Sequence, residues 1–358
     1  EEGVFHVTVP AWRFDISIEA DLVEEVGRIY GYDKIPSTLP TTASTQGGLT
    51  EKQRFVRWTR QFMQGAGLSQ AYSYALTTPE KSHWFTVEER PSIRLDLPMS
   101  EDRSELRQSM LPSLLEALQY NVARSQQNVR LFEVGKVFSI GKNGSEDFQE
   151  REVIGAAVTG EWGHASWQLP AQPVDFFALK GVLEAYFAEL NCSDRIRFVA
   201  TDAIGQLHPG QTAYIYLGEE LIGFIGKIHP VIQKELDLSD TFVFELLVEP
   251  LLAEGLQERV IQAVPKFPSM TRDIALLVPV TMAHATLEAV IKEQAGQYVQ
   301  SVTLFDVYKG EHVQEGYQSL AYSIRFLNKE ATLQEEEIKQ AMDRIQTALV
   351  ALDDVTIR

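Results

Sequence analysis

Residues 319–326 read SLAYSIRF, the stretch that decides the fold of the C-terminal part of the chain. Apolar and other side chains alternate through it, and the large apolar set is Leu320, Tyr322, Ile324 and Phe326. Successive side chains of a β-strand point to opposite faces of a sheet. The pattern therefore predicts a strand with one buried face, and the opposite face carries Ala321, Ser323 and Arg325.

The elements predicted on either side of this strand complete a known order. They are a strand at 272–278, a helix at 284–294, a strand at 301–308, the strand at 319–326, a helix at 333–352 and a short strand at 355–357. This βαββαβ order is that of the ferredoxin-like split βαβ fold. Its two helices cover one face of an antiparallel sheet and leave the other face free.

The free face of this sheet is a candidate surface for reading RNA. Alternation in the second strand sends Phe305 and Val307 into the core and Asp306 and Tyr308 outward. Asp273 of the first strand joins them, as do the Ser323 and Arg325 already named. An aromatic ring beside a guanidinium and carboxylates can stack on one unpaired base and read its edge. The alternative is an ordinary solvated sheet surface, which this pattern alone favours.

The rest of the chain predicts two further segments joined by a linker. Residues 1–40 contain an apolar strand candidate at 4–9 and a helix at 19–30, which Gly31 ends. Residues 41–49 are polar and glycine-containing, typical of a linker. Residues 50–258 mix strands and helices in the manner of an antiparallel α+β domain, and residues 265–358 are the ferredoxin-like domain.

The central segment supplies several local signals. Thr50 and Gln53 form a capping-box pattern at the start of a helix. Further helices are predicted at 111–123 and 177–190, a strand at 128–140, and a hairpin from strands at 213–217 and 221–225. The order indicates an antiparallel α+β fold rather than regularly alternating βαβ units.

Composition limits the classes of function. The 358 residues carry 32 Lys and Arg against 50 Asp and Glu, a net charge of −18, which makes non-specific binding to nucleic acid or to a membrane surface unfavourable. DNA is an improbable partner for residues 1–47, which carry 3 basic and 8 acidic side chains. Cys192 is the single cysteine, so the chain has no internal disulfide and fits a reducing, cytoplasmic location. No apolar run is long enough to span a membrane. The chain starts without Met, inside the strand candidate, so we expect it to be part of a longer protein.

Four carboxylates form a candidate metal site near the N-terminus: Asp15, Asp21, Glu24 and Glu25. The last three share one helix face, and Asp15 precedes the helix closely enough to fold over its first turn. Oxygen ligands without His or Cys suit Mg²⁺ rather than zinc. Acidic side chains in a first helical turn are also stabilised by the helix dipole without a metal, and this is the simpler explanation of the spacing.

No catalytic motif stands out elsewhere. His208 and His229 each precede a proline without a second ligand at metal-binding spacing, which indicates turn histidines bonded to the backbone. The chain contains no nucleophile elbow, phosphate-binding loop or dinucleotide fingerprint. We therefore predict no catalytic residue in it.

Longer motifs resemble one known family throughout the chain. Residues 10–36, PAWRFDISIEADLVEEVGRIYGYDKIP, resemble the second half of the B5 domain of the bacterial phenylalanyl-tRNA synthetase beta subunit. Residues 104–115, 131–138 and 207–211 resemble that subunit's catalytic-like module, and residues 265–358 resemble its ferredoxin-fold anticodon-binding domain. The motifs occur in the family's order.

This resemblance implies a function that the residues alone do not. The family enzyme is an α₂β₂ class II aminoacyl-tRNA synthetase that joins phenylalanine to tRNA(Phe) with ATP and Mg²⁺. The resemblance implies that catalysis and ATP binding belong to the alpha subunit and that this chain supports assembly and recognises the anticodon. It aligns a Mg²⁺ site shared with the alpha subunit with Asp15, Asp21, Glu24 and Glu25, and places anticodon recognition on Asp273, Asp306, Tyr308, Ser323 and Arg325.

Two alternatives remain at this point. The chain could be a purely structural dimerisation scaffold without RNA contact. It could also be a metalloenzyme that uses the four carboxylates, although the sequence offers no general base near them. The family's third motif supplies an arginine for ATP, and none is recognisable here; residues 130–133, RLFE, are similar to part of the second motif, but strand packing explains them as well.

Overall fold

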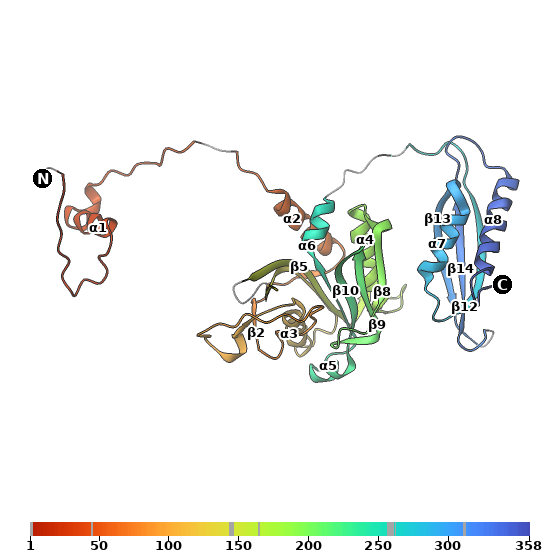
Figure 1. The fold of residues 1–358 in the computed structure, drawn as a ribbon, viewed down its shortest axis with the longest axis horizontal. Coiled ribbons are helices and arrows are strands. Elements are labelled where there is room, and N and C mark those ends of the chain that lie inside the picture. The colour runs from red at the N-terminus through yellow and green to blue at the C-terminus, as the bar shows by residue number, and fades with distance from the viewer. Residues whose placement is uncertain are drawn as a thin grey trace. The chain divides into compact units, whose positions relative to one another are not determined.

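The computed structural model describes residues 3–43, 46–142, 147–163, 165–255, 261, 263–310 and 313–358. Residues 44, 45 and 256–258, which belong to the predicted linker and to the predicted end of the central segment, lie outside the described residues. The chain divides into two compact units, Glu1–Gln257 and Glu258–Arg358. Figure 1 shows the elements of each unit.

The N-terminal segment contains one helix, α1 (Glu19–Tyr30), followed by the 3₁₀ turn η1 (Tyr32–Lys34). Gly31 ends α1 with φ of 102°, a conformation that favours glycine. The prediction of a strand at 4–9 is wrong, because these residues have no regular secondary structure. A strand exists only when another strand accepts its ladder of hydrogen bonds, and no strand of the described chain pairs with this one.

A seven-stranded sheet forms the centre of the first unit, in the order β1-β4-β5-β11-β10-β9-β8. The β1–β4 pair is parallel and the other neighbouring pairs are antiparallel. The strands are β1 (Ser69–Gln70), β4 (Val129–Ile140), β5 (Phe148–Thr159), β8 (Ile196–Ala200), β9 (Leu207–Leu217), β10 (Glu220–Ile228) and β11 (Thr241–Leu247). Shorter elements are β2 (Leu76–Thr77), β3 (Glu105–Leu106), β6 (Glu161–Gly163), β7 (Gln172–Pro173), η2 (Glu101–Arg103) and η3 (Ser193–Arg195).

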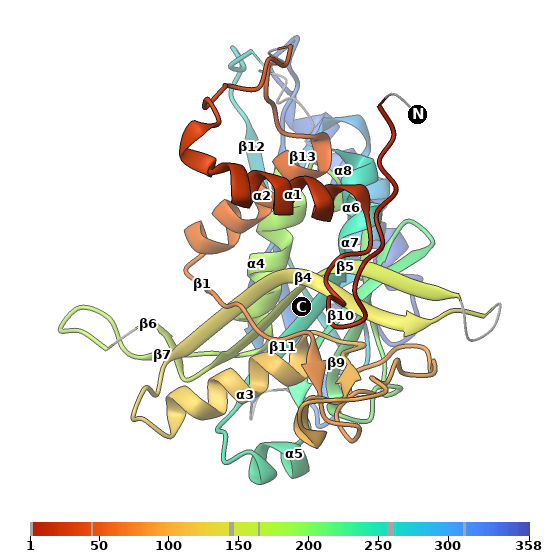
Figure 2. The same ribbon diagram turned by 90° about the vertical axis from the view of Figure 1, so that its left-hand side faces the viewer.

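Helices cover both faces of this sheet. They are α2 (Glu51–Gly65), α3 (Leu111–Val122), α4 (Phe176–Glu189), α5 (Pro230–Glu235) and α6 (Val248–Glu254). Figure 2 shows α4 on one side of the sheet and α3 and α5 on the other. β5 accordingly buries Ile154 and Ala156 in the core with α2 and α4, and Val153 and Ala157 in the core with α3.

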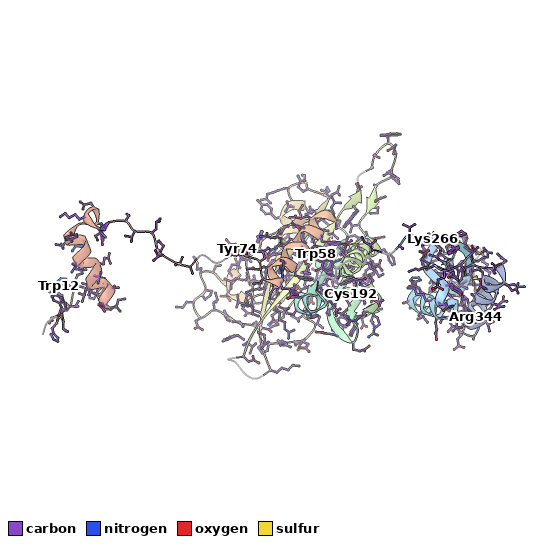
Figure 3. The ribbon with its side chains drawn as sticks, turned by 90° about the horizontal axis from the view of Figure 1, so that it is seen from above. Trp12, Trp58, Tyr74, Cys192, Lys266 and Arg344 are labelled. Atoms are coloured by element: carbon purple, nitrogen blue, oxygen red, sulfur yellow. The ribbon has the colours of Figure 1, made fainter. Side chains whose placement is uncertain are left out.

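Local signals in the sequence set the ends of these helices. The predicted capping box is confirmed: the Gln53 N–H donates to Thr50 Oγ1, and the Thr50 N–H donates to the Gln53 side chain. Farther along α2, Trp58 lies among the side chains of this unit and stacks on Tyr186 at 5.3 Å between ring centroids (Figure 3). No helix in the described part of the chain is long and apolar enough to cross a membrane.

The second unit has the predicted ferredoxin-like topology. Its elements are β12 (Met270–Pro279), α7 (His284–Ala295), η4 (Gly296–Tyr298), β13 (Val299–Tyr308), β14 (Tyr317–Phe326), α8 (Glu335–Val350) and β15 (Thr356–Ile357). The antiparallel sheet has the order β13-β14-β12-β15, and both helices pack on the face that buries Leu320, Tyr322, Ile324 and Phe326.

The predicted burial of Phe305 and Val307 is wrong. Their side chains are 57% and 51% exposed, whereas Val302 and Leu304 earlier in β13 pack against the core. The register between β13 and β14 shifts between Leu304 and Asp306, so Phe305 sits at a bulge without a partner in β14. β13 is also an edge strand, so the helices do not cover its far end fully.

Candidate nucleic-acid interface and carboxylate cluster

Strand register places the predicted RNA-reading residues on one face of the β13-β14-β12 sheet. Ser323 of β14 lies directly between Thr303 of β13 and Asp273 of β12. Asp306 is opposite Ala321, and Tyr308 is opposite Ser319. All of these positions alternate with the buried set of β14, so they belong to the helix-free face.

The same register separates this face into two ends. Tyr308 and Asp306 are two residues apart on β13, about 7 Å along the strand. Arg325 is six positions along β14 from Ser319, the partner of Tyr308, which amounts to about 20 Å. Asp306 can therefore reach a base stacked on Tyr308, but Arg325 cannot contact that same base. Of the two residues expected to contact the edge of the stacked base, the register therefore leaves Asp306 within reach and Arg325 out of reach.

Tyr308 occupies a defined position at the end of β13. Its side chain is 38% exposed, and its hydroxyl end lies over Gly310, where a β-carbon would come within 2.6 Å of Oη. The Tyr308 ring can therefore occupy this position because Gly310 has no side chain. A ring that is held yet open to solvent loses little freedom when a base stacks on it.

Arginines neutralise half of the N-terminal carboxylate cluster. The Arg13 guanidinium donates to Asp15 at 2.7 Å and to Glu25 at 2.7 Å, and Arg28 donates to the other oxygen of Glu25 at 2.7 Å. The hydrogen bonds from Arg13 and Arg28 hold the pKa of Glu25 at about 2, and the hydrogen bond from Arg13 also lowers the pKa of Asp15. The structure thus brings Asp15 and Glu25 together around a cation that the chain itself supplies.

The other two carboxylates do not join them. Asp21 accepts hydrogen bonds from the backbone N–H groups of Ser17 and Ile18, at 2.7 and 2.9 Å, and so caps α1. These bonds lower its pKa. Glu24 is exposed, and the Tyr32 hydroxyl contacts only its backbone carbonyl. Within the described ranges no three His, Cys, Asp or Glu side chains are arranged to hold a metal ion. As arranged, the four carboxylates therefore do not fit Mg²⁺.

Residues of the central unit that resemble catalytic motifs have structural partners. Glu133 is buried and pairs with buried Arg107 at 3.2 Å, and the Ser73 hydroxyl donates to it at 2.6 Å. Arg130 donates to the Trp162 carbonyl. The turn histidines are confirmed: Nδ1 of His208 accepts from the Gly210 N–H, and Nδ1 of His229 from the Val231 N–H.

Comparison with known families identifies the chain. Residues 35–248 match the family described as "Phenylalanyl tRNA synthetase beta chain CLM domain". The chain belongs to the phenylalanyl-tRNA synthetase beta chain family. Residues 265–358 match the "Ferredoxin-fold anticodon binding domain" and residues 1–32 the "tRNA synthetase B5 domain", so the resemblance seen in the sequence is confirmed.

Relatives in this family are longer than the chain. It is 49% identical over 343 residues to the phenylalanine–tRNA ligase beta subunit of Bacillus subtilis, which covers 96% of the chain and 42% of that relative. It is 44% identical over 353 residues to the corresponding protein of Latilactobacillus sakei, covering 98% of the chain and 44% of the relative. The chain thus spans less than half the length of these beta subunits. Among solved structures, a pyrrolysyl-tRNA synthetase of Desulfitobacterium hafniense is similar at 12% identity and a TM-score of 0.41, covering 56% of the chain and 66% of that structure.

Sequence reasoning missed three residues that contribute to these sites. Arg13 and Arg28 flank the acidic cluster at spacings that allow ion pairs. These spacings are as consistent with neutralisation of the carboxylates by arginine as with neutralisation by a metal ion. Gly310 follows Tyr308 by two residues, but only coordinates reveal that the ring lies over it.

Proposed function

We propose that this member of the synthetase beta chain family supports assembly with the catalytic alpha subunit and recognises the anticodon of tRNA(Phe). The complete cytoplasmic α₂β₂ enzyme then joins phenylalanine to tRNA(Phe) with ATP and Mg²⁺, and the chemistry takes place on the alpha subunit. The observation that carries the proposal is the helix-free sheet face with Tyr308 and Asp306 side by side, in a domain matched to anticodon-binding domains.

The chemistry of this face favours one unpaired base as the ligand. The Tyr308 ring offers a stacking surface, and the Asp306 carboxylate accepts hydrogen bonds from an exocyclic amine or ring N–H about 7 Å along the strand. Ser323 and Asp273 lie in the next row, and Arg325 at the far end suits a phosphate or a neighbouring nucleotide. Residues 265–358 carry 9 basic and 13 acidic side chains, so this face contributes selectivity and most of the affinity comes from the rest of the enzyme.

The N-terminal carboxylates are the proposed contact with the alpha subunit. A Mg²⁺ ion shared with that subunit requires Asp15 and Glu25 to exchange Arg13 for the metal, because the guanidinium now lies between them. The family resemblance supports the shared Mg²⁺ site, and the arrangement of Arg13 in this structure does not. Its test is Mg²⁺-dependent association with the alpha subunit, in wild type and in Asp15→Asn with Glu24→Gln. This pair leaves the Asp21 cap of α1 intact.

Tyr308→Ala in the assembled enzyme tests anticodon recognition directly. Binding of tRNA(Phe) and of an anticodon-swapped tRNA should be compared at one fixed salt concentration. Stacking on an aromatic side chain is worth about 1–3 kcal/mol per base, so the variant should lose roughly ten- to a hundred-fold affinity for tRNA(Phe) only. Val307→Ala is the matched control, because Val307 is the exposed neighbour on the opposite sheet face.

Gly310→Ala gives a second, independent variant. Its β-carbon displaces the Tyr308 ring without removing it, so selectivity should fall by less than in Tyr308→Ala. If Tyr308→Ala binds each of the two tRNAs as tightly as wild type does, the alternative of a scaffold without RNA contact is favoured.

A further inference from the structure

A cavity of about 260 Å³ lies in the central unit, and none of its lining residues belongs to either site described above. Apolar side chains form its walls, among them Phe85, Val137, Val153 and Phe224, which belong to the core on the α3 side of the sheet. Cavities of this kind, mostly apolar with a few convergent polar groups, are where small molecules bind.

A buried carboxyl group lines this cavity. Glu245 of β11 is only 9% exposed, and its Oε2 accepts both the Met110 N–H at 2.6 Å and the Ser109 hydroxyl at 2.9 Å, just before α3. The structure gives Oε1 no hydrogen bond from the described residues. A carboxylate has lone pairs on both oxygens, and Oε1 is not among the buried side-chain atoms that lack a partner, so it keeps some accessible surface on the cavity side. A ligand that carries an N–H group can satisfy it.

Arginines also line the cavity. Arg90 and Arg151 line it together with Glu88, and Arg90 donates to Glu88 at 2.6 Å. Arg151 is exposed, so its guanidinium is available to an anionic group. Glu245 pairs with Gly155 of β5, four residues or about 13 Å along that strand from Arg151, so the carboxyl group and the guanidinium are well separated along the lining.

One strained residue shapes the wall. Phe85 is fully buried yet has φ of 62°, a left-handed conformation that costs a non-glycine residue about 1–3 kcal/mol. Its N–H donates to the Gln206 side chain at 3.2 Å, which helps to hold it there. The ring of Phe85 is thus held in the cavity wall against a local conformational cost.

We propose that this cavity binds a small zwitterion with an apolar body, its amine on Glu245 Oε1 and its acidic group on Arg151. Neither the sheet face of the second unit nor the N-terminal carboxylates take part, so the proposal stands apart from the proposed function. A suitable probe is 4-(aminomethyl)benzoate, which places an amine and a carboxylate at opposite ends of a ring.

Binding of this probe to the 358-residue chain can be measured by ligand-observed NMR and calorimetry at pH 8, where Glu245 is ionised. Wild type should bind with a Kd of about 0.1–1 mM, in the range of a fragment-sized ligand. Glu245→Gln and Arg151→Gln should each weaken binding at least about five-fold. Glu220→Gln, an exposed glutamate on β10 outside the cavity, should bind as wild type does.

Two further probes separate the ends of the ligand. Benzylamine should be sensitive to Glu245→Gln and not to Arg151→Gln, and 4-methylbenzoate should show the reverse. Arg151→Gln changes an exposed side chain, so it stays informative if Glu245→Gln perturbs folding. No saturable binding by wild type, or equal binding by wild type and Arg151→Gln, would overturn the proposal.

Discussion

Glu245→Gln should remove a pH dependence from the stability of the central unit. Burial raises the pKa of Glu245 to about 7 from its ordinary 4.5, against the opposing effects of the hydrogen bonds from Met110 and Ser109 and of the Arg107 charge. Between these two pH values the folded protein keeps the proton and the unfolded chain releases it. The unfolded state therefore binds fewer protons there, and stability falls as pH rises from 4.5 to about 7.

The magnitude follows from the gap between the two pKa values. Each pKa unit corresponds to about 1.4 kcal/mol, so the loss over this window is roughly 3 kcal/mol. Glutamine keeps the shape and can still accept the bond from the Met110 N–H, but it carries no charge to bury. The variant should match wild type near pH 4.5 and be more stable by up to about 3 kcal/mol above pH 7.

Tryptophan fluorescence during urea unfolding isolates the relevant unit, because all five tryptophans precede residue 168. Trp58, Trp84 and Trp162 are partly buried in the central unit and report its unfolding. Free energies of unfolding should be measured from pH 4.5 to 8 for wild type, Glu245→Gln and the exposed control Glu220→Gln. If wild type and Glu245→Gln have parallel pH profiles, Glu245 does not titrate near 7 in the folded state and the reasoning is wrong.

Three further predictions concern other parts of the chain. Arg13→Gln should raise the pKa of Glu25 from about 2 toward 4.5, because the hydrogen bond from Arg13 is the largest cause of its low value. Side-chain carboxyl NMR measures this pKa, and the exposed control Arg54→Gln should leave it unchanged. An unchanged pKa in Arg13→Gln would contradict the prediction. Thr50→Ala should destabilise the central unit by about 1 kcal/mol through loss of the α2 cap, whereas Thr50→Ser should not, and equal urea midpoints would exclude the cap's role. The chain without alpha subunit should show no phenylalanine-dependent ATP–pyrophosphate exchange, and activity in a preparation free of that subunit would refute the assignment of catalysis to the alpha subunit.

Features that depend on near neighbours in the chain were predictable. The Thr50–Gln53 capping box, the end of α1 at Gly31 and the alternation from Leu320 to Phe326 are each written within a few residues. The helix-free position of Tyr308 and Asp306 also followed from alternation, because β13 pairs with β14 at those two positions without a further shift. Family motifs added the functional context that residue patterns could not supply.

Other features were set by partners distant in the sequence. The segment at 4–9 alternates like a strand yet has no ladder partner, and a bulge in β13 exposes Phe305. The net charge of the carboxylate cluster depends on the position of the Arg13 side chain in the folded chain. The burial of Glu245 depends on the start of α3, more than a hundred residues earlier in the chain. The sequence by itself determined the longer helices, the cap of α2, the faces of β14 and the family. Tertiary structure alone decided strand register, bulges, ion pairs and the burial of charged groups. The interactions that determine these features form between segments that only folding brings together.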